Sequence, residues 1–132
     1  MQKMINLTID DKKVEVEEGS TVLQAAEKLG IKIPTLCHHK SLLPYGACRV
    51  CLVEVVKSWG PSIQASCVYP AEEGMVIQTD SERVLRTRRM MLELLLARCP
   101  DSPRIIEMAK EMGIEEPRFP KMNENCILCG LC

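Results

Sequence analysis

Four cysteines in the first half of the chain constrain its fold more than any other feature. They are Cys37, Cys48, Cys51 and Cys67, spaced C-x10-C-x2-C-x15-C. The central C-x2-C pair lets two sulfurs reach one small metal centre, and four thiolates are the ligand set of a [2Fe–2S] cluster. A four-cysteine zinc site normally uses two C-x2-C pairs, whereas this half of the chain has one. Spacing alone therefore favours iron–sulfur and leaves zinc open.

The cysteine content also bears on where such a chain works. Eight cysteines in 132 residues point either to disulfides or to metal. The N-terminal stretch MQKMINLTIDDKK lacks the apolar core of a signal peptide, and no run of about 18 apolar residues occurs. We therefore expect a cytoplasmic protein without direct membrane insertion, in which thiols stay reduced and metal is favoured. The net charge of −1 argues against nucleic acid as a partner.

The pattern around the cysteines predicts an α+β fold, because short strands precede and follow a helix. Thr21 and Gln24 form a capping box at the start of a helix over 22–29. Residues 35–51 are expected to form a long loop, and 57–61 a turn. Alternating and β-branched segments predict strands over 3–9, 12–17, 52–56, 63–66 and 75–78.

The composition changes near Asp80. Residues 81–97 predict a strong helix whose end, MMLELLLA, is so apolar that it should be buried against this domain or a partner. A second helix should begin near Pro103 and end at Gly113. Residues 114–125 are polar and contain two prolines, which is typical of a linker. The predicted parts are a domain over 1–80, a helical extension over 81–113, and a linker with a cysteine-rich tail over 114–132.

The residues that flank the four cysteines narrow the choice of metal. A resemblance to the N-terminal domain of the large iron–sulfur subunit of NADH–quinone oxidoreductase runs over about residues 3–98. It is carried by EEGSTVLQAAEKLGIKIPTLC, LLPYGACRVCLVEV, ASC and EEGMVIQT. The chain equally resembles the N-terminal domains of iron-only hydrogenases and NAD-linked formate dehydrogenases. The resemblance implies a β-grasp, 2Fe-2S ferredoxin-like domain in which all four cysteines bind a [2Fe–2S] cluster.

Three polar residues beside the cysteines are further candidates. His38 and His39 follow Cys37 directly, but the sequence lacks the Cys-x-His pairs of a Rieske site. We expect loop histidines that bond to backbone or face solvent. Arg49 lies inside the C-x2-C turn, where its charge either raises the cluster potential or forms a surface ion pair worth little.

A second cysteine group closes the sequence. Cys126, Cys129 and Cys132 form C-x2-C-x2-C, the opening of the bacterial ferredoxin run that binds [4Fe–4S]. NENCILCGLC resembles the start of such a motif in the same hydrogenase and formate dehydrogenase families. Three ligands do not complete a four-cysteine site. Either the natural protein continues, or Cys99, which precedes a proline, is the fourth ligand, or a partner subunit supplies it. We favour the first. If Cys99 is not a ligand, we expect it to be a buried free thiol at a helix end.

The expected function follows from the resemblance and from missing motifs. The sequence has neither a dinucleotide-binding fingerprint nor a P-loop, and it offers no Ser, His and Asp set that indicates a catalytic triad. We expect an electron-carrier component with no substrate site of its own, within a cytoplasmic multi-subunit oxidoreductase. It would relay single electrons through a [2Fe–2S] and a [4Fe–4S] cluster. Its partners would be flavin- or NAD-binding, hydrogenase or formate dehydrogenase subunits. The alternatives are a zinc-stabilised adaptor without redox activity and a free-standing soluble ferredoxin.

Overall fold

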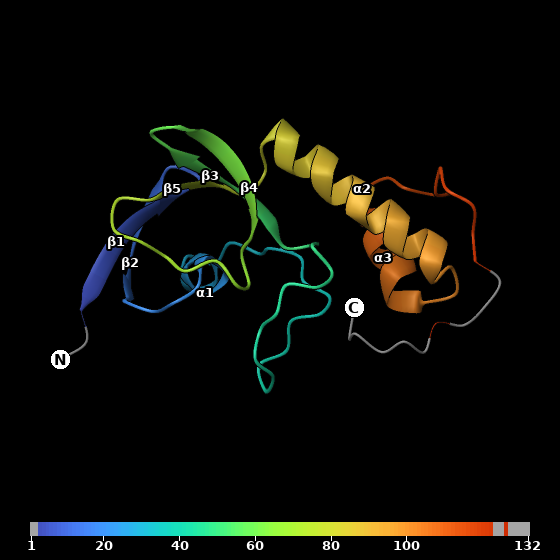
Figure 1. The fold of residues 1–132 in the computed structure, drawn as a ribbon, viewed down its shortest axis with the longest axis horizontal. Helices are drawn as coiled ribbons and strands as arrows, with labels where there is room; N and C mark the ends of the chain where they lie inside the picture. The colour runs from blue at the N-terminus through green and yellow to red at the C-terminus, as the bar shows by residue number, and fades with distance from the viewer. Residues whose placement is uncertain (1–2, 123–125, 127–132) are drawn as a thin grey trace.

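Five strands form one mixed sheet at one end of the molecule, and two helices extend from it (Figure 1). The structure, a computed structural model, describes residues 3–122 and 126. The strand order is β2-β1-β5-β3-β4; β1 and β5 are parallel, and the other neighbours are antiparallel. This arrangement confirms the predicted α+β class. The elements are β1 (Met4–Ile9), β2 (Lys12–Glu17), α1 (Val22–Lys28), β3 (Leu52–Lys57), β4 (Gly60–Ala65), β5 (Val76–Gln78), α2 (Glu82–Arg98) and α3 (Pro103–Glu111).

The first hairpin forms where the alternating pattern predicted it. Asp10 and Asp11 connect β1 to β2 with φ angles of 49° and 66°. Left-handed residues at both central positions match the twist of the flanking strands. The Asp10 carboxylate also accepts hydrogen bonds from the backbone N–H of Thr79, at 2.8 Å, and from the Thr79 hydroxyl. The turn is therefore fixed to the chain that follows β5.

The predicted capping box starts α1. The Gln24 N–H donates to the Thr21 hydroxyl at 3.3 Å, and the Thr21 N–H donates to the Gln24 side-chain oxygen at 2.9 Å. Each group satisfies a backbone donor that the helix leaves free. The helix then buries Val22 and Leu23 in the core that it shares with the sheet.

The second hairpin differs from the expected turn over 57–61. Lys57 pairs with Gly60, so β4 begins three residues earlier than the predicted start at residue 63. Pro61 pairs with Val56 within the ladder. Because β4 is the outermost strand, the missing proline N–H leaves no ladder hydrogen bond broken on its open side. The proline was therefore a misleading turn signal.

The apolar end of α2 is buried within this chain. Leu92 and Leu96 of α2 pack with Ile105 and Met108 of α3 in a second hydrophobic core. Figure 1 shows α3 lying along the far half of α2. The sequence predicted that MMLELLLA is buried either against this domain or against a partner. The structure shows it buried within this chain, although Leu94 remains 44% exposed.

The segment after α3 is irregular but packs along α2. Ile114 is buried, and its N–H donates to the Ala109 carbonyl at 2.8 Å. Further on, the Met122 N–H donates to the Ala97 carbonyl at 2.8 Å. The described part of the predicted linker is therefore held against the two helices.

Candidate metal centre

The four candidate cysteines meet at the junction of the two hydrophobic cores. Cys51 and Cys67 belong to the core of the sheet, whereas Cys37 and Cys48 belong to the core of α2 and α3. Each of them is between 1% and 6% exposed. The electrostatic influence of the other three reaches the Cys67 thiol, so residues separated by up to thirty positions converge on one place. Sequence spacing predicted this convergence.

The thiols approach one another as two pairs. The Cys37 N–H donates to the Cys48 sulfur at 3.4 Å, and the Cys67 thiol interacts most strongly with Cys51. Within residues 3–122 and at 126, no three His, Cys, Asp or Glu side chains are arranged to hold a single metal ion. A [2Fe–2S] cluster takes its four thiolates as two on each iron, so two pairs suit that ligand set.

The electrostatics of Cys48 and Cys67 favour protonated sulfur when no metal is bound. Burial raises the pKa of the Cys48 thiol, although the backbone N–H groups of Val50 and Cys37 act against that rise. Burial and then the nearby Cys51 raise the pKa of the Cys67 thiol to about 12. A bound metal deprotonates a coordinating thiol, because its positive charge compensates the buried thiolate. The donor set therefore fits a metal centre with a cationic core, such as that of a [2Fe–2S] cluster.

The backbone around Cys51 is anchored on both sides. Ser66 donates its hydroxyl, at 2.7 Å, and its N–H, at 3.1 Å, to the Cys51 carbonyl. Arg88 of α2 donates to the Val50 carbonyl at 3.1 Å and to the Leu52 carbonyl at 2.6 Å. Three consecutive carbonyls are thus held by groups from other parts of the chain.

The sequence-based prediction missed Arg88, although a signal was present. Val84, Arg88, Leu92 and Leu96 recur every four residues and all four are buried. A charged residue inside an apolar helical stripe is rarely left unpaired, because burying a charge costs free energy. The stripe marked Arg88 as the one arginine of α2 that faces inward.

Gly46 lets the loop pass close to the segment after Cys67. Its φ is +67°, and a Cβ at this position would lie 3.2 Å from Cγ2 of Val68. Glycine is therefore required at this position for two reasons, its left-handed backbone conformation and its lack of a side chain. Arg49, inside the C-x2-C turn, also has a left-handed backbone, with φ of 58°, and is exposed.

The histidines of the loop differ in their surroundings. His39 bonds to backbone as expected, because its Nδ1 accepts the Ser41 N–H at 3.1 Å. Nδ1 of His38 is buried and has no hydrogen-bond partner in the described part of the chain. The tip of the loop is open, and Leu43 is 91% exposed.

The second cysteine group lies partly within the described structure. Cys99 follows the last residue of α2 and is partly exposed, as is Cys126. The hydrogen bond between Met122 and Ala97 brings the chain back to the end of α2, two residues before Cys99. Cys129 and Cys132 lie outside the described residues.

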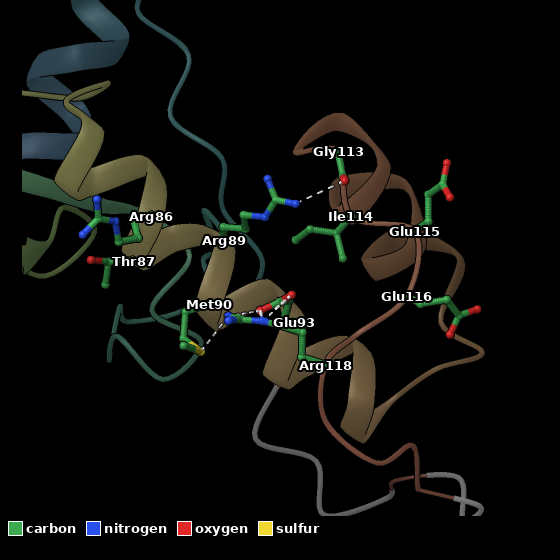
Figure 2. Close-up of a pocket in the computed structure, with 10 residues that line it drawn as sticks. All are labelled: Arg86, Thr87, Arg89, Met90, Glu93, Gly113, Ile114, Glu115, Glu116 and Arg118. Atoms are coloured by element: carbon green, nitrogen blue, oxygen red, sulfur yellow. Dashed lines mark hydrogen bonds and ion pairs between the residues drawn. The ribbon is translucent and has the colours of Figure 1, made fainter.

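A pocket of about 910 Å³ lies away from the cysteines, between α2 and the segment after α3. Figure 2 shows Arg86, Arg89 and Met90 along α2 on one side, with Glu115 and Glu116 on the other. The Arg89 guanidinium donates to the Gly113 carbonyl at 3.4 Å.

These features define an iron–sulfur electron-transfer domain. The family described as "2Fe-2S iron-sulfur cluster binding domain" matches residues 2–82, a stretch that contains all four paired cysteines. The chain belongs to this family, which confirms the expected 2Fe-2S ferredoxin-like fold and the [2Fe–2S] type of cluster.

Similar proteins of known identity indicate which kind of [2Fe–2S] domain this chain contains. The chain is 43% identical to a subunit of the NADH-quinone oxidoreductase of Rhizobium meliloti, over 98% of this chain and 18% of that protein. It is 39% identical to the mitochondrial NADH-ubiquinone oxidoreductase 78 kDa subunit of Candida albicans, over 85% of this chain and 15% of that protein. It therefore spans less than a fifth of these relatives.

A solved structure agrees with these relatives. An NAD+-reducing [NiFe]-hydrogenase in its H2-reduced state contains a chain with a TM-score of 0.82 and 31% identity. The match covers 97% of this chain and 64% of the other. Together these relatives confirm the resemblance to the N-terminal 2Fe-2S domain of the NADH–quinone oxidoreductase and hydrogenase family.

Proposed function

We propose that Cys37, Cys48, Cys51 and Cys67 hold a [2Fe–2S] cluster. The observation that carries this proposal is their burial as two pairs at the junction of two cores. When bound, the cluster accepts and releases one electron at a time. The chain's own part is to exclude water from the sulfurs and to direct backbone N–H groups at them, which tunes the reduction potential.

A second, [4Fe–4S] cluster at the C-terminal group extends the relay. Cys126, Cys129 and Cys132 supply three ligands, and Cys99 is the candidate for the fourth within the described residues. The return of the chain to the end of α2, through the Met122 to Ala97 hydrogen bond, supports a place for Cys99 in this site. A remote cysteine followed by proline completes a cluster in two-cluster ferredoxins, which gives the arrangement a chemical precedent.

The chain then works as one component of a larger oxidoreductase. The similarity to the NADH-quinone oxidoreductase of Rhizobium meliloti and to the NAD+-reducing hydrogenase supports partner subunits that act on NADH, NAD+ or hydrogen. We place the complex in the cytoplasm, where thiols stay reduced. No helix among the described residues is long and apolar enough to cross a membrane. We also propose the division into three parts expected from the sequence, over 1–80, 81–113 and 114–132.

The first cluster is tested on anaerobically reconstituted protein. Iron and acid-labile sulfide should be present, and reduction should give a [2Fe–2S] electron paramagnetic resonance (EPR) signal that persists at the higher of two temperatures. Cys51→Ser and Cys67→Ser should each abolish or strongly alter that signal. Protein that takes up zinc and neither iron nor sulfide would replace this proposal with the zinc-stabilised adaptor.

The second cluster is tested by its fast-relaxing signal, which appears only at low temperature. Cys99→Ser should remove the [4Fe–4S] signal and leave the [2Fe–2S] signal intact, and Cys126→Ser serves as the matched loss control. A full [4Fe–4S] signal in Cys99→Ser would assign the fourth ligand to a cysteine beyond residue 132 or to a partner subunit.

A further inference from the structure

Arg88 is a buried cation whose contacts are backbone carbonyls. It is 5% exposed, and it donates to the carbonyls of Val50, Leu52 and Thr79 at 3.1, 2.6 and 3.2 Å. No carboxylate of residues 3–122 forms an ion pair with it. Burial lowers the pKa of its guanidinium, and the nearby Cys51 and Asp80 oppose that change. An arginine keeps its charge in proteins, so a positive charge persists inside this core.

The carbonyls that Arg88 holds belong to the ligand segment itself. Val50 lies between two candidate ligands, and its N–H acts on the Cys48 sulfur while its carbonyl binds Arg88. Leu52 follows Cys51 directly and begins β3. One guanidinium from α2 therefore binds the backbone carbonyls immediately before and immediately after Cys51.

This contact has an electrostatic consequence as well as a geometric one. Reducing an iron–sulfur cluster adds one negative charge, and a fixed positive charge beside it stabilises the reduced form. The interaction is strong when the charge is buried, because the surrounding dielectric constant is lower than that of water. Exposed arginines of the same helix, such as Arg86, are screened by water and salt.

We propose that Arg88 positions the Cys48–Cys51 ligand segment and raises the reduction potential of the [2Fe–2S] cluster. The inference rests on the proposed ligand set of that cluster. Arg88 acts through the backbone and through its charge, so it is a positioning residue and not a ligand. It also makes α2 part of the cluster site, since the helix supplies a buried cation beside the ligand segment.

Four variants distinguish the effect of the Arg88 charge from the effect of its hydrogen-bond geometry. Arg88→Gln removes the charge and keeps amide donors for the carbonyls. Arg88→Met removes both, and Arg88→Lys keeps the charge and loses the planar fork. Arg86→Gln is the matched control, because it removes an arginine from the exposed face of the same helix, where the side chain is 78% exposed.

The readout is the midpoint potential of the [2Fe–2S] EPR signal in a redox titration. Arg88→Gln and Arg88→Met should each shift the reduction equilibrium toward the oxidised form by tenfold or more, which is a fall of about 59 mV per tenfold for one electron. Arg86→Gln should shift it several times less. Arg88→Lys should stay close to the wild-type potential with altered g values.

Other outcomes are decisive too. Wild-type potentials in both neutral variants would overturn the claim that the charge of Arg88 raises the reduction potential. A failure of all three Arg88 variants to assemble a cluster would overturn that claim too and leave Arg88 only its role in positioning the ligand segment. Assembly in Arg88→Lys alone would support the need for the charge. A wild-type protein without a [2Fe–2S] signal would instead refute the proposed ligand set.

Discussion

Arg118 closes over the buried carboxylate of Glu93 with three hydrogen bonds, at 2.6, 3.0 and 3.1 Å. Glu93 lies on α2 and is 4% exposed, whereas the Arg118 side chain lies at the surface. Figure 2 shows the pair between the helix and the segment that follows α3. The contact therefore fixes that irregular segment to α2.

Removing Arg118 should destabilise the protein more than removing an ordinary surface arginine. Arg118→Ala leaves the Glu93 carboxylate buried without its partner, and an uncompensated buried charge is costly. Arg104→Ala is the control, because Arg104 forms only an exposed pair with Glu107, at 3.4 Å. The urea midpoint should fall clearly in Arg118→Ala and stay close to wild type in Arg104→Ala. Equal midpoints would mean that the Glu93 carboxylate is solvated in another way.

The cluster loop should not tolerate a side chain at Gly46. Gly46→Ala adds left-handed strain of about 1–2 kcal/mol, and its Cβ would press on Val68. Gly30→Ala is matched for strain, with φ of +74°, but nothing lies within 4 Å of the added Cβ.

Iron content and denaturation together check this expectation. Both glycine variants should lose stability, and only Gly46→Ala should also lose iron after reconstitution. Adding Val68→Ala to Gly46→Ala should restore part of the iron. Equal iron in the two single variants would show that the close approach to Val68 does not matter.

The capping box of α1 should contribute about 1 kcal/mol to stability. Thr21→Ala removes the oxygen that accepts the Gln24 N–H, at the helix end whose Leu23 N–H donates to the Ser66 carbonyl at 3.0 Å. Thr87→Ala is a matched control, because the Thr87 hydroxyl bonds back to the Arg83 carbonyl within α2 and caps nothing. Thermal or urea unfolding should separate the two, and an equal loss in both would argue against the cap.

Local signals made the first half of the fold predictable. The capping residues, the aspartate turn and the alternating strands each act over a few residues, so their structure can be derived from the sequence. The cysteine spacing also predicted the convergence of the four thiols, because cysteines that share one metal centre must lie together however far apart they are in the sequence. The role of each cysteine as a ligand stays a prediction.

The misses came from packing between distant segments. Three contacts depend on which faces of distant segments meet in three dimensions. They are the packing of α3 against α2, the hydrogen bond from Arg88 to Val50, and the ion pair between Arg118 and Glu93. A hydrophobic pattern marks a face as buried but does not name its partner. The early start of β4 at Gly60 was missed because the following proline fits both a turn and an edge strand.

The cluster-free protein should lose stability in alkali through its buried thiols. The pKa of Cys67 is raised from 9.0 to about 12 in the folded chain, so the folded state holds this proton more tightly than the unfolded state. The resulting stability is complete below the unfolded pKa and declines as the pH rises from about 9 to about 12. The raised pKa of Cys48 acts in the same direction.

Reduced, cluster-free wild type and Cys67→Ser should therefore respond differently to pH. Between about pH 8 and about pH 10.5, the urea midpoint of the wild type should fall further, because serine does not titrate in this range while lysines and tyrosines contribute equally to both proteins. Once the wild type carries its cluster, its alkaline decline should disappear, since a metal-bound thiolate has no proton to lose whereas the unfolded thiol still binds one below its own pKa. A parallel decline of both cluster-free proteins would mean that the Cys67 thiol is solvated and not held in the core.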